Sequence, residues 1–146
     1  MKDVLKTVLL AVALNPLYAH ADDITRSVAA DACLKQAGEN SADCLEAAGL
    51  ASDNKLKEAF SAKITALQNF DYTRWPQGDE ARRTQMVEAL QASQQAWTAA
   101  RDAFCTAASA SAAGTPLLAA HALSCVINMN QRRIEELALI QPESEK

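Results

Sequence analysis

Residues 105–125 read CTAASASAAGTPLLAAHALSC, and this stretch decides the fold because two cysteines bracket a turn. Residues 114–116, Gly-Thr-Pro, lie midway between Cys105 and Cys125. One continuous helix would separate these cysteines by about 30 Å, whereas a disulfide tolerates roughly 4.4–6.8 Å between its Cα atoms. The stretch therefore predicts an antiparallel helical hairpin that a Cys105–Cys125 disulfide closes.

The other two cysteines, Cys33 and Cys44, show the same arrangement around Gly38 and Glu39. A continuous helix would hold them about 16 Å apart, so they too must bracket a chain reversal. Four cysteines allow three pairings, and the spacing favours Cys33 with Cys44 and Cys105 with Cys125. A four-thiolate zinc site requires more closely spaced cysteine pairs, so we expect two disulfides within hairpins and no metal.

The N-terminus has the three parts of a secretory signal peptide in the expected order. Lys2 and Lys6 precede an apolar run, residues 7–14, and residues 19–21 form the small-residue motif Ala-His-Ala. The run is too short to span a membrane, and Pro16 argues against the alternative of an ordinary buried helix. We therefore expect residues 1–21 to be removed and residues 22–146 to form a single domain in the periplasm or outside the cell.

The charge of the expected mature domain favours a protein partner over nucleic acid. Loss of Lys2, Asp3 and Lys6 leaves 12 basic and 17 acidic residues, a net charge of −5 compared with −4 for the whole chain. Nucleic-acid binding depends on cations that neutralise phosphates, so an acidic domain is better suited to a basic protein. No segment after residue 21 is apolar enough to insert stably into a membrane.

Glycine and proline divide the rest of the domain into helical segments. Alanine-rich stretches of high helix propensity lie between them, and no alternating β-branched run predicts a strand. We expect an all-α bundle of four to five helices with no glycine or proline inside any helix. The expected helices are residues 23–37, a short helix capped by Asn40 or Ser41 that ends near Gly49, residues 53–69, residues 79–112, and a last helix with Thr115 as N-cap and Pro116 at its first position.

Polar side chains interrupt the apolar stripes of the last two helices. The stripe of segment 79–112 contains Met86, Val87, Leu90, Gln94, Trp97, Arg101, Phe104 and Ala108, and Arg133 lies on the stripe of the last helix. A buried arginine must be paired or must extend its charged end to water. We expect a buried polar network that ties these two helices and includes Asp102, while a ligand-binding role for Gln94, Arg101 and Arg133 stays open.

The sequence offers no group of residues suited to catalysis. His121 is the only histidine after residue 21, and it lies among alanines with no carboxylate three or four residues away. Glu135 and Glu136 are adjacent, so on a helix their side chains point about 100° apart and do not converge on one substrate. Because no base is set beside a nucleophile and no phosphate-binding loop is present, we expect a binding protein that is not an enzyme and uses no cofactor.

The longest irregular stretch, residues 69–80, is the candidate for contact with a partner. It holds half of the mature aromatic residues, and tyrosine and tryptophan are enriched at interface hot spots. We expect partner contacts from Asp71, Tyr72, Trp75, Asp79 and Glu80. The alternative is that Phe70 and Trp75 only cover the end of the bundle.

One motif resembles a known bacterial family. Residues 90–105 read LQASQQAWTAARDAFC, which fits the pattern L-x3-Q-x2-W-x3-R-D-x2-C of LprI-type lysozyme-inhibitor domains, and Cys125 and an R-x3-L motif follow. The resemblance covers roughly residues 86–140; Asn130 stands where the family often has threonine, and the lipoprotein cysteine of some members is missing. The resemblance implies that the motif residues are mainly structural: Gln94, Trp97, Arg101, Asp102, Arg133 and Leu137.

Three functions fit these observations. The resemblance implies inhibition of lysozyme, and we expect residues 69–80 to occlude the active cleft of a basic, lysozyme-like hydrolase. A periplasmic immunity protein that neutralises one dedicated toxin has the same size, export and disulfides, and a pull-down would recover that toxin. A non-inhibitory envelope module would hold a small ligand between the last two helices, which native mass spectrometry would detect.

Overall fold

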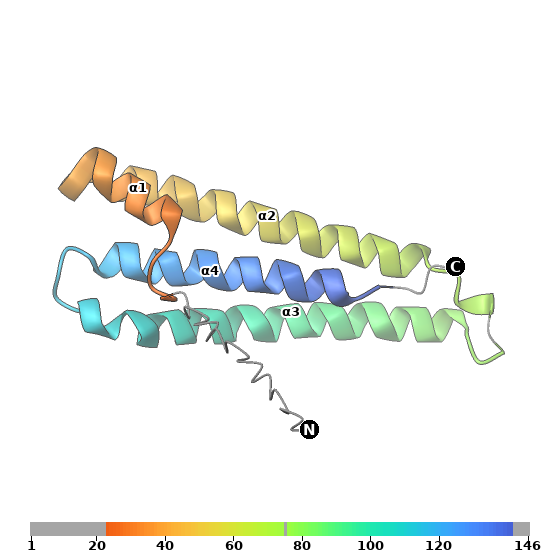
Figure 1. Ribbon diagram of the computed structural model, residues 1–146. Coiled ribbons are helices and arrows are strands. Elements are labelled where there is room, and N and C mark those ends of the chain that lie inside the picture. The colour runs from red at the N-terminus through yellow and green to blue at the C-terminus, as the bar shows by residue number, and fades with distance from the viewer. Residues whose placement is uncertain (1–22, 75, 142–146) are drawn as a thin grey trace, which may run out of the picture.

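The computed structural model describes residues 23–74 and 76–141, and every long element in them is an α-helix (Figure 1). The helices are α1 (Val28–Ala37), α2 (Ala42–Asn69), α3 (Glu80–Ala108) and α4 (Leu118–Leu139). Three short 3-10 helices lie between them: η1 (Gly38–Asn40), η2 (Tyr72–Arg74) and η3 (Ser109–Ala112). The all-α prediction is confirmed; the expected signal peptide lies outside the described residues.

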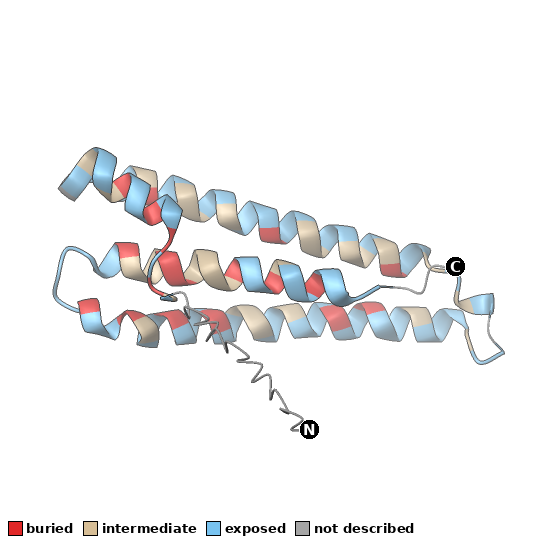
Figure 2. Ribbon diagram, in the orientation of Figure 1, coloured by how far each residue is buried: buried red, intermediate tan, exposed pale blue. Residues whose placement is uncertain are grey.

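The three long helices form the body of the molecule. Each of α2, α3 and α4 contacts the other two, and α1 folds back along the start of α2 and packs on α4. Figure 2 shows that the buried residues follow the sides on which the helices meet. The result is a three-helix bundle with a short fourth helix covering one end.

Both predicted disulfides are present. Cys33–Cys44 and Cys105–Cys125 have Cα–Cα distances of 5.6 Å and 5.4 Å. Cys33 also belongs to a buried cluster with Ala30, Leu45 and Ala120 of α4. The two crosslinks therefore lie at the same end of the bundle, where α1, the start of α2, the end of α3 and the start of α4 meet.

The expectation of a helix break near Gly49 is wrong, because residues 42–69 form one continuous helix. A Cβ atom added to Gly49 would lie 2.9 Å from the Cδ1 atom of Leu123 on α4. This distance is too short for an ordinary contact, so the glycine allows α4 to approach α2 closely. Gly49 marks a packing contact between helices and not the end of one.

Replacement of Gly49 by Ala tests this close approach. Alanine is favoured over glycine inside a helix by about 1 kcal/mol, but in the wild-type protein the new methyl group must displace Leu123 and we expect this gain to be lost. In a Leu123→Ala background the same change is expected to stabilise the protein by about 1 kcal/mol. Urea unfolding of the four proteins measures the coupling, and additive effects would contradict it.

Several helix ends differ from those expected. α1 begins at Val28 and not near residue 23, because the Ser27 side chain accepts a hydrogen bond from the backbone N–H of Ala30 and caps the helix. The expected cap of the last helix is wrong by two residues. The Thr115 hydroxyl accepts from the Leu117 N–H at 3.2 Å, which closes a turn that contains Pro116, and α4 begins only at Leu118.

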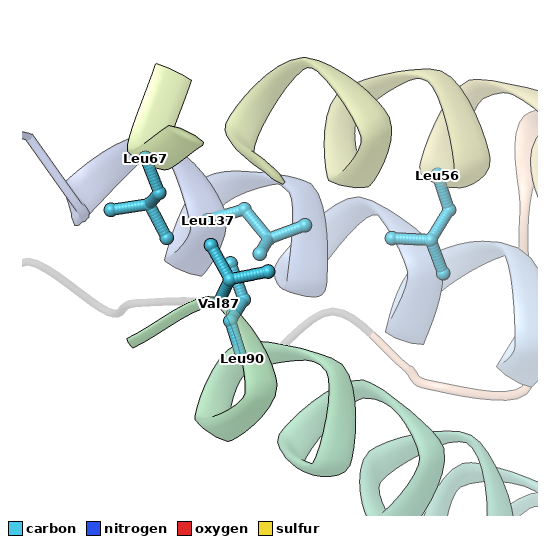
Figure 3. Packing of buried hydrophobic residues seen from close by; sticks show 5 residues of the cluster. All are labelled: Leu56, Leu67, Val87, Leu90 and Leu137. Carbon is cyan, nitrogen blue, oxygen red and sulfur yellow. The ribbon is translucent and has the colours of Figure 1, made fainter. Parts of the chain in front are cut away.

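The main hydrophobic core lies toward the other end of the bundle. Figure 3 shows side chains from α2, α3 and α4 pointing toward one another there. The buried members of this cluster are Leu56, Leu67, Val87, Leu90 and Leu137, with Phe60, Ile64, Trp97 and Ile134 packed against them. Leu137, expected to be structural, is only 1% exposed.

Two residues of the expected α3 stripe do not belong to the core. Met86 and Phe104 are 44% and 48% exposed, although the predicted apolar stripe of segment 79–112 includes both. Cys105 is 2% exposed because its disulfide holds this position of α3 against α4. The preceding residue, Phe104, is rotated by about 100° around the helix and faces water.

Candidate functional site

A polar network crosses the middle of the bundle, centred on Trp97 of α3. The guanidinium carbons of Arg101 and Arg133 each lie 5.6 Å from the centroid of the Trp97 ring. At this distance a cation is attracted to the face of an aromatic ring. The half-buried tryptophan therefore links one arginine of α3 to one of α4.

Arg101 joins three helices. Its Nη1 donates to Asn130 Oδ1 on α4 at 2.7 Å and to Asp53 Oδ1 on α2 at 3.1 Å, and its Nε donates to Asp102 Oδ1 at 2.9 Å. Asn130 is fully buried, and its amide donates to Asp53 Oδ1 at 2.8 Å and to Ser52 Oγ at 3.0 Å. The carboxylates of Asp53 and Asp102 are about half exposed, so they pair with the arginine while remaining in contact with water.

Arg133 joins α4 to α3 in the same way. Its Nε donates to Gln94 Oε1, its Nη1 to Glu136 Oε2 and its Nη2 to Ser93 Oγ, each at 3.0 Å. Arg101 and Arg133 are both only 9% exposed. Both guanidinium groups are thus held by bonds inside the protein, which fits a role in positioning helices better than a role in holding a ligand.

The structure confirms the expected network of Gln94, Arg101, Asp102 and Arg133 and adds members that the sequence analysis missed. Asp53 and Ser52 lie on α2, 48 or more residues before Arg101, and nothing in the local pattern distinguishes them from other surface residues. Asn130 was noted only as a departure from the family pattern. It is fully buried and connects α4 to Arg101 of α3 and Asp53 of α2.

The loop expected to contact a partner lies at the end of the bundle remote from the disulfides (Figure 1). Asp71 Oδ1 accepts bonds from the Thr73 hydroxyl at 2.6 Å and from the Thr73 N–H at 3.0 Å. These bonds, the hydroxyl first, lower the pKa of Asp71 below its usual value of 3.8, so the carboxylate stays ionised. The Phe70 and Tyr72 rings pack edge to face with centroids 4.8 Å apart.

The other acidic residues of this loop also have partners within the chain. Asp79 caps α3 by accepting from the backbone N–H of Arg82 at 2.8 Å, and Glu80 forms an ion pair with Arg83. The loop therefore uses its predicted contact side chains Asp71, Asp79 and Glu80 to hold its own shape. Trp75 lies outside the described residues, and its predicted contact stays a prediction.

His121 lies at the disulfide end of the bundle, close to Ser124 on the same helix. Its Nδ1 atom is buried and has no hydrogen-bond partner, and its ring lines a hollow of about 230 Å³ between α1 and α4. The neighbouring Ser124 hydroxyl accepts a bond from the Ser27 hydroxyl at 3.1 Å and is not engaged by the histidine. Among residues 23–74 and 76–141, no group of three metal-ligating side chains occurs.

The hairpin between α3 and α4 presents a different surface, which we call the stapled tip: residues 103–121, closed by the Cys105–Cys125 disulfide. Three large apolar side chains are exposed on it: Phe104 at 48%, Leu117 at 45% and Leu118 at 40%. Residues 103–131 contain no aspartate, glutamate, lysine or arginine. The sequence analysis missed this surface because it placed Phe104 in the core.

Comparison with known proteins identifies one family. A family profile described as "Lysozyme inhibitor LprI" matches residues 33–137. The match begins at Cys33 and ends at Leu137, so it includes both disulfides and the whole polar network and extends well beyond the resemblance near residues 86–140. No curated protein and no solved structure matches the sequence.

None of the helices in the described part of the chain has the length and apolar character that a membrane span requires.

Proposed function

Because the chain belongs to the lysozyme inhibitor LprI family, we propose that it is an exported inhibitor of lysozyme or of a related peptidoglycan hydrolase. The inhibitor binds the folded hydrolase and occludes the cleft in which the glycan strand is cleaved. The observation that carries this proposal is the family match over residues 33–137, which covers most of the chain. The buried network and the two disulfides support it, because they make a rigid scaffold that loses little entropy on binding.

Charge supports a basic hydrolase as the partner. The expected mature domain has a net charge of −5, and complementary charge speeds the encounter of two proteins and suppresses wrong partners. Salt is therefore expected to slow association with the hydrolase.

The proposed place of action is the periplasm or the cell exterior. Both disulfides suit an oxidising compartment, and the signal-like sequence of residues 1–21 would direct the chain there. Peptidoglycan lies in the same compartment, so the inhibitor would meet the hydrolase at its substrate.

An assay of cell-wall lysis tests the function. The oxidised protein, purified after export, is mixed with a basic lysozyme, and the clearing of a turbid cell-wall suspension is followed. We expect inhibition that reaches completion near one inhibitor per enzyme, and an unrelated acidic helical protein serves as control. Undiminished lysis by a panel of lysozyme-like hydrolases at micromolar inhibitor would overturn the proposal.

A further inference from the structure

We propose that the stapled tip is the part of the protein that enters the active cleft of the hydrolase, with Phe104, Leu117 and Leu118 as its apolar contacts. This inference rests on the proposed function and specifies its contact surface. It places the surface that enters the cleft of the hydrolase at the end of the bundle opposite to residues 69–80.

The first argument is the composition of the exposed surface. The protein leaves Phe104, Leu117 and Leu118 in water within a segment, residues 103–131, that has no charged side chain. Charged residues are depleted at the centres of protein interfaces, and aromatic residues are enriched there. A charge-free segment with exposed apolar side chains therefore has the composition of an interface centre.

The second argument is rigidity. The Cys105–Cys125 disulfide closes the base of the tip, and hydroxyl groups hold its turns. Ser109 Oγ donates to the Cys105 carbonyl at 2.9 Å, and Thr115 Oγ1 donates to the Ala112 carbonyl at 2.8 Å. A segment already held in one conformation loses little entropy on binding, which favours tight inhibition.

The third argument is the chemistry of the cleft. Glycosidases of the lysozyme type carry two carboxyl groups that flank the scissile bond. The loop at the other end would bring Asp71 close to these groups, and its bonds to Thr73 keep the pKa of Asp71 low and the side chain charged. Like charges brought together in a cleft repel each other, whereas the exposed apolar side chains of the tip, Phe104, Leu117 and Leu118, carry no charge.

The fourth argument is the acidic flank of the tip. Ala30 of α1 and Leu45 of α2 belong to one buried cluster with Ala120, so α1 and the start of α2 lie beside the tip. Apart from residue 39, residues 23–46 carry four acidic and two basic side chains, all of them exposed. This flank would face the basic surface around the cleft while the apolar tip enters it, so both parts of the contact are complementary.

Substitutions at the two ends of the bundle test the assignment. The tip variant carries Phe104→Ser, Leu117→Ser and Leu118→Ser, and a second tip variant, Leu117→Glu, introduces one carboxylate. The matched control carries Asp71→Asn and Tyr72→Ser in the remote loop. All substituted tip residues are at least 40% exposed, and circular dichroism melting and thiol titration confirm that each variant is folded and oxidised.

We expect both tip variants to raise the inhibition constant by about 100-fold in the lysis assay, and the loop control to change it by less than about 3-fold. Loss of inhibition in the loop control with retention in the tip variants would overturn the proposal. It would indicate that residues 69–80 enter the cleft of the hydrolase. Retention in all variants would also overturn it. Tip variants that change only self-association in ultracentrifugation would show a contact between copies of this chain instead. Failure of the proposed function itself is distinguishable, because the unsubstituted protein would then not inhibit.

Discussion

Replacement of Arg101 by Met is expected to lower the free energy of unfolding by about 2 to 4 kcal/mol. The change leaves the Oδ1 atom of the fully buried Asn130 without the donor that now lies at 2.7 Å. It also removes the guanidinium group that bonds to α2 and α4 and lies over Trp97. Urea unfolding followed by far-ultraviolet circular dichroism measures the loss.

Asp102→Asn is the matched control for Arg101→Met. The Asp102 side chain is 59% exposed, so hydrogen bonds to water replace much of the stabilisation that its bond to Arg101 provides. We expect this variant to lose less than about 1 kcal/mol. Equal losses for the two variants would show that the pairing at the surface, and not the buried bond to Asn130, carries the stability of the network.

Removal of the Cys105–Cys125 disulfide in a Cys105→Ala, Cys125→Ala variant is expected to cost about 3 kcal/mol of stability. The bond closes a segment of the unfolded chain with a sequence separation of 20 residues, and its loss increases the entropy of the unfolded state. Because the same bond holds the stapled tip, we also expect weaker inhibition under conditions in which the variant remains folded.

The Cys33→Ala, Cys44→Ala variant separates the two effects. Its disulfide has a sequence separation of 11, so its loss is expected to cost a comparable amount, about 3 kcal/mol. This crosslink lies in the acidic flank and not in the tip, so inhibition by the folded variant is expected to weaken less than inhibition by the Cys105→Ala, Cys125→Ala variant. Equal weakening of inhibition by both variants would indicate that overall rigidity, and not the tip, determines the affinity.

The helical fold and the disulfide pairing could be predicted because both depend on short-range geometry. The spacing of Cys105 and Cys125 around Gly114 excludes one straight helix, whatever the rest of the chain does. Gly49 shows the limit of such reasoning. A glycine at a helix end and a glycine at a helix crossing have the same local appearance, and only the contact with Leu123 distinguishes them.

The candidate site was less predictable because its residues come from different helices. The sequence placed Gln94, Arg101 and Arg133 on buried stripes, and the network confirms this, but Asp53 and Asn130 join it only where α2 and α4 meet α3. The expected loop contacts remain a prediction. The stapled tip became visible only from the exposure of Phe104, Leu117 and Leu118.

Helix propensity and residue spacing act between positions that are near in the chain, so the helices, the two disulfide-closed hairpins and the Gln-Trp-Arg-Asp-Cys motif of the family could all be predicted from the amino-acid sequence. The rotation of each helix about its axis could not be predicted in this way, because it is set by contacts between helices that are far apart in the chain. That rotation depends on the simultaneous packing of α2, α3 and α4, and it buried Asn130 and turned Phe104 toward water.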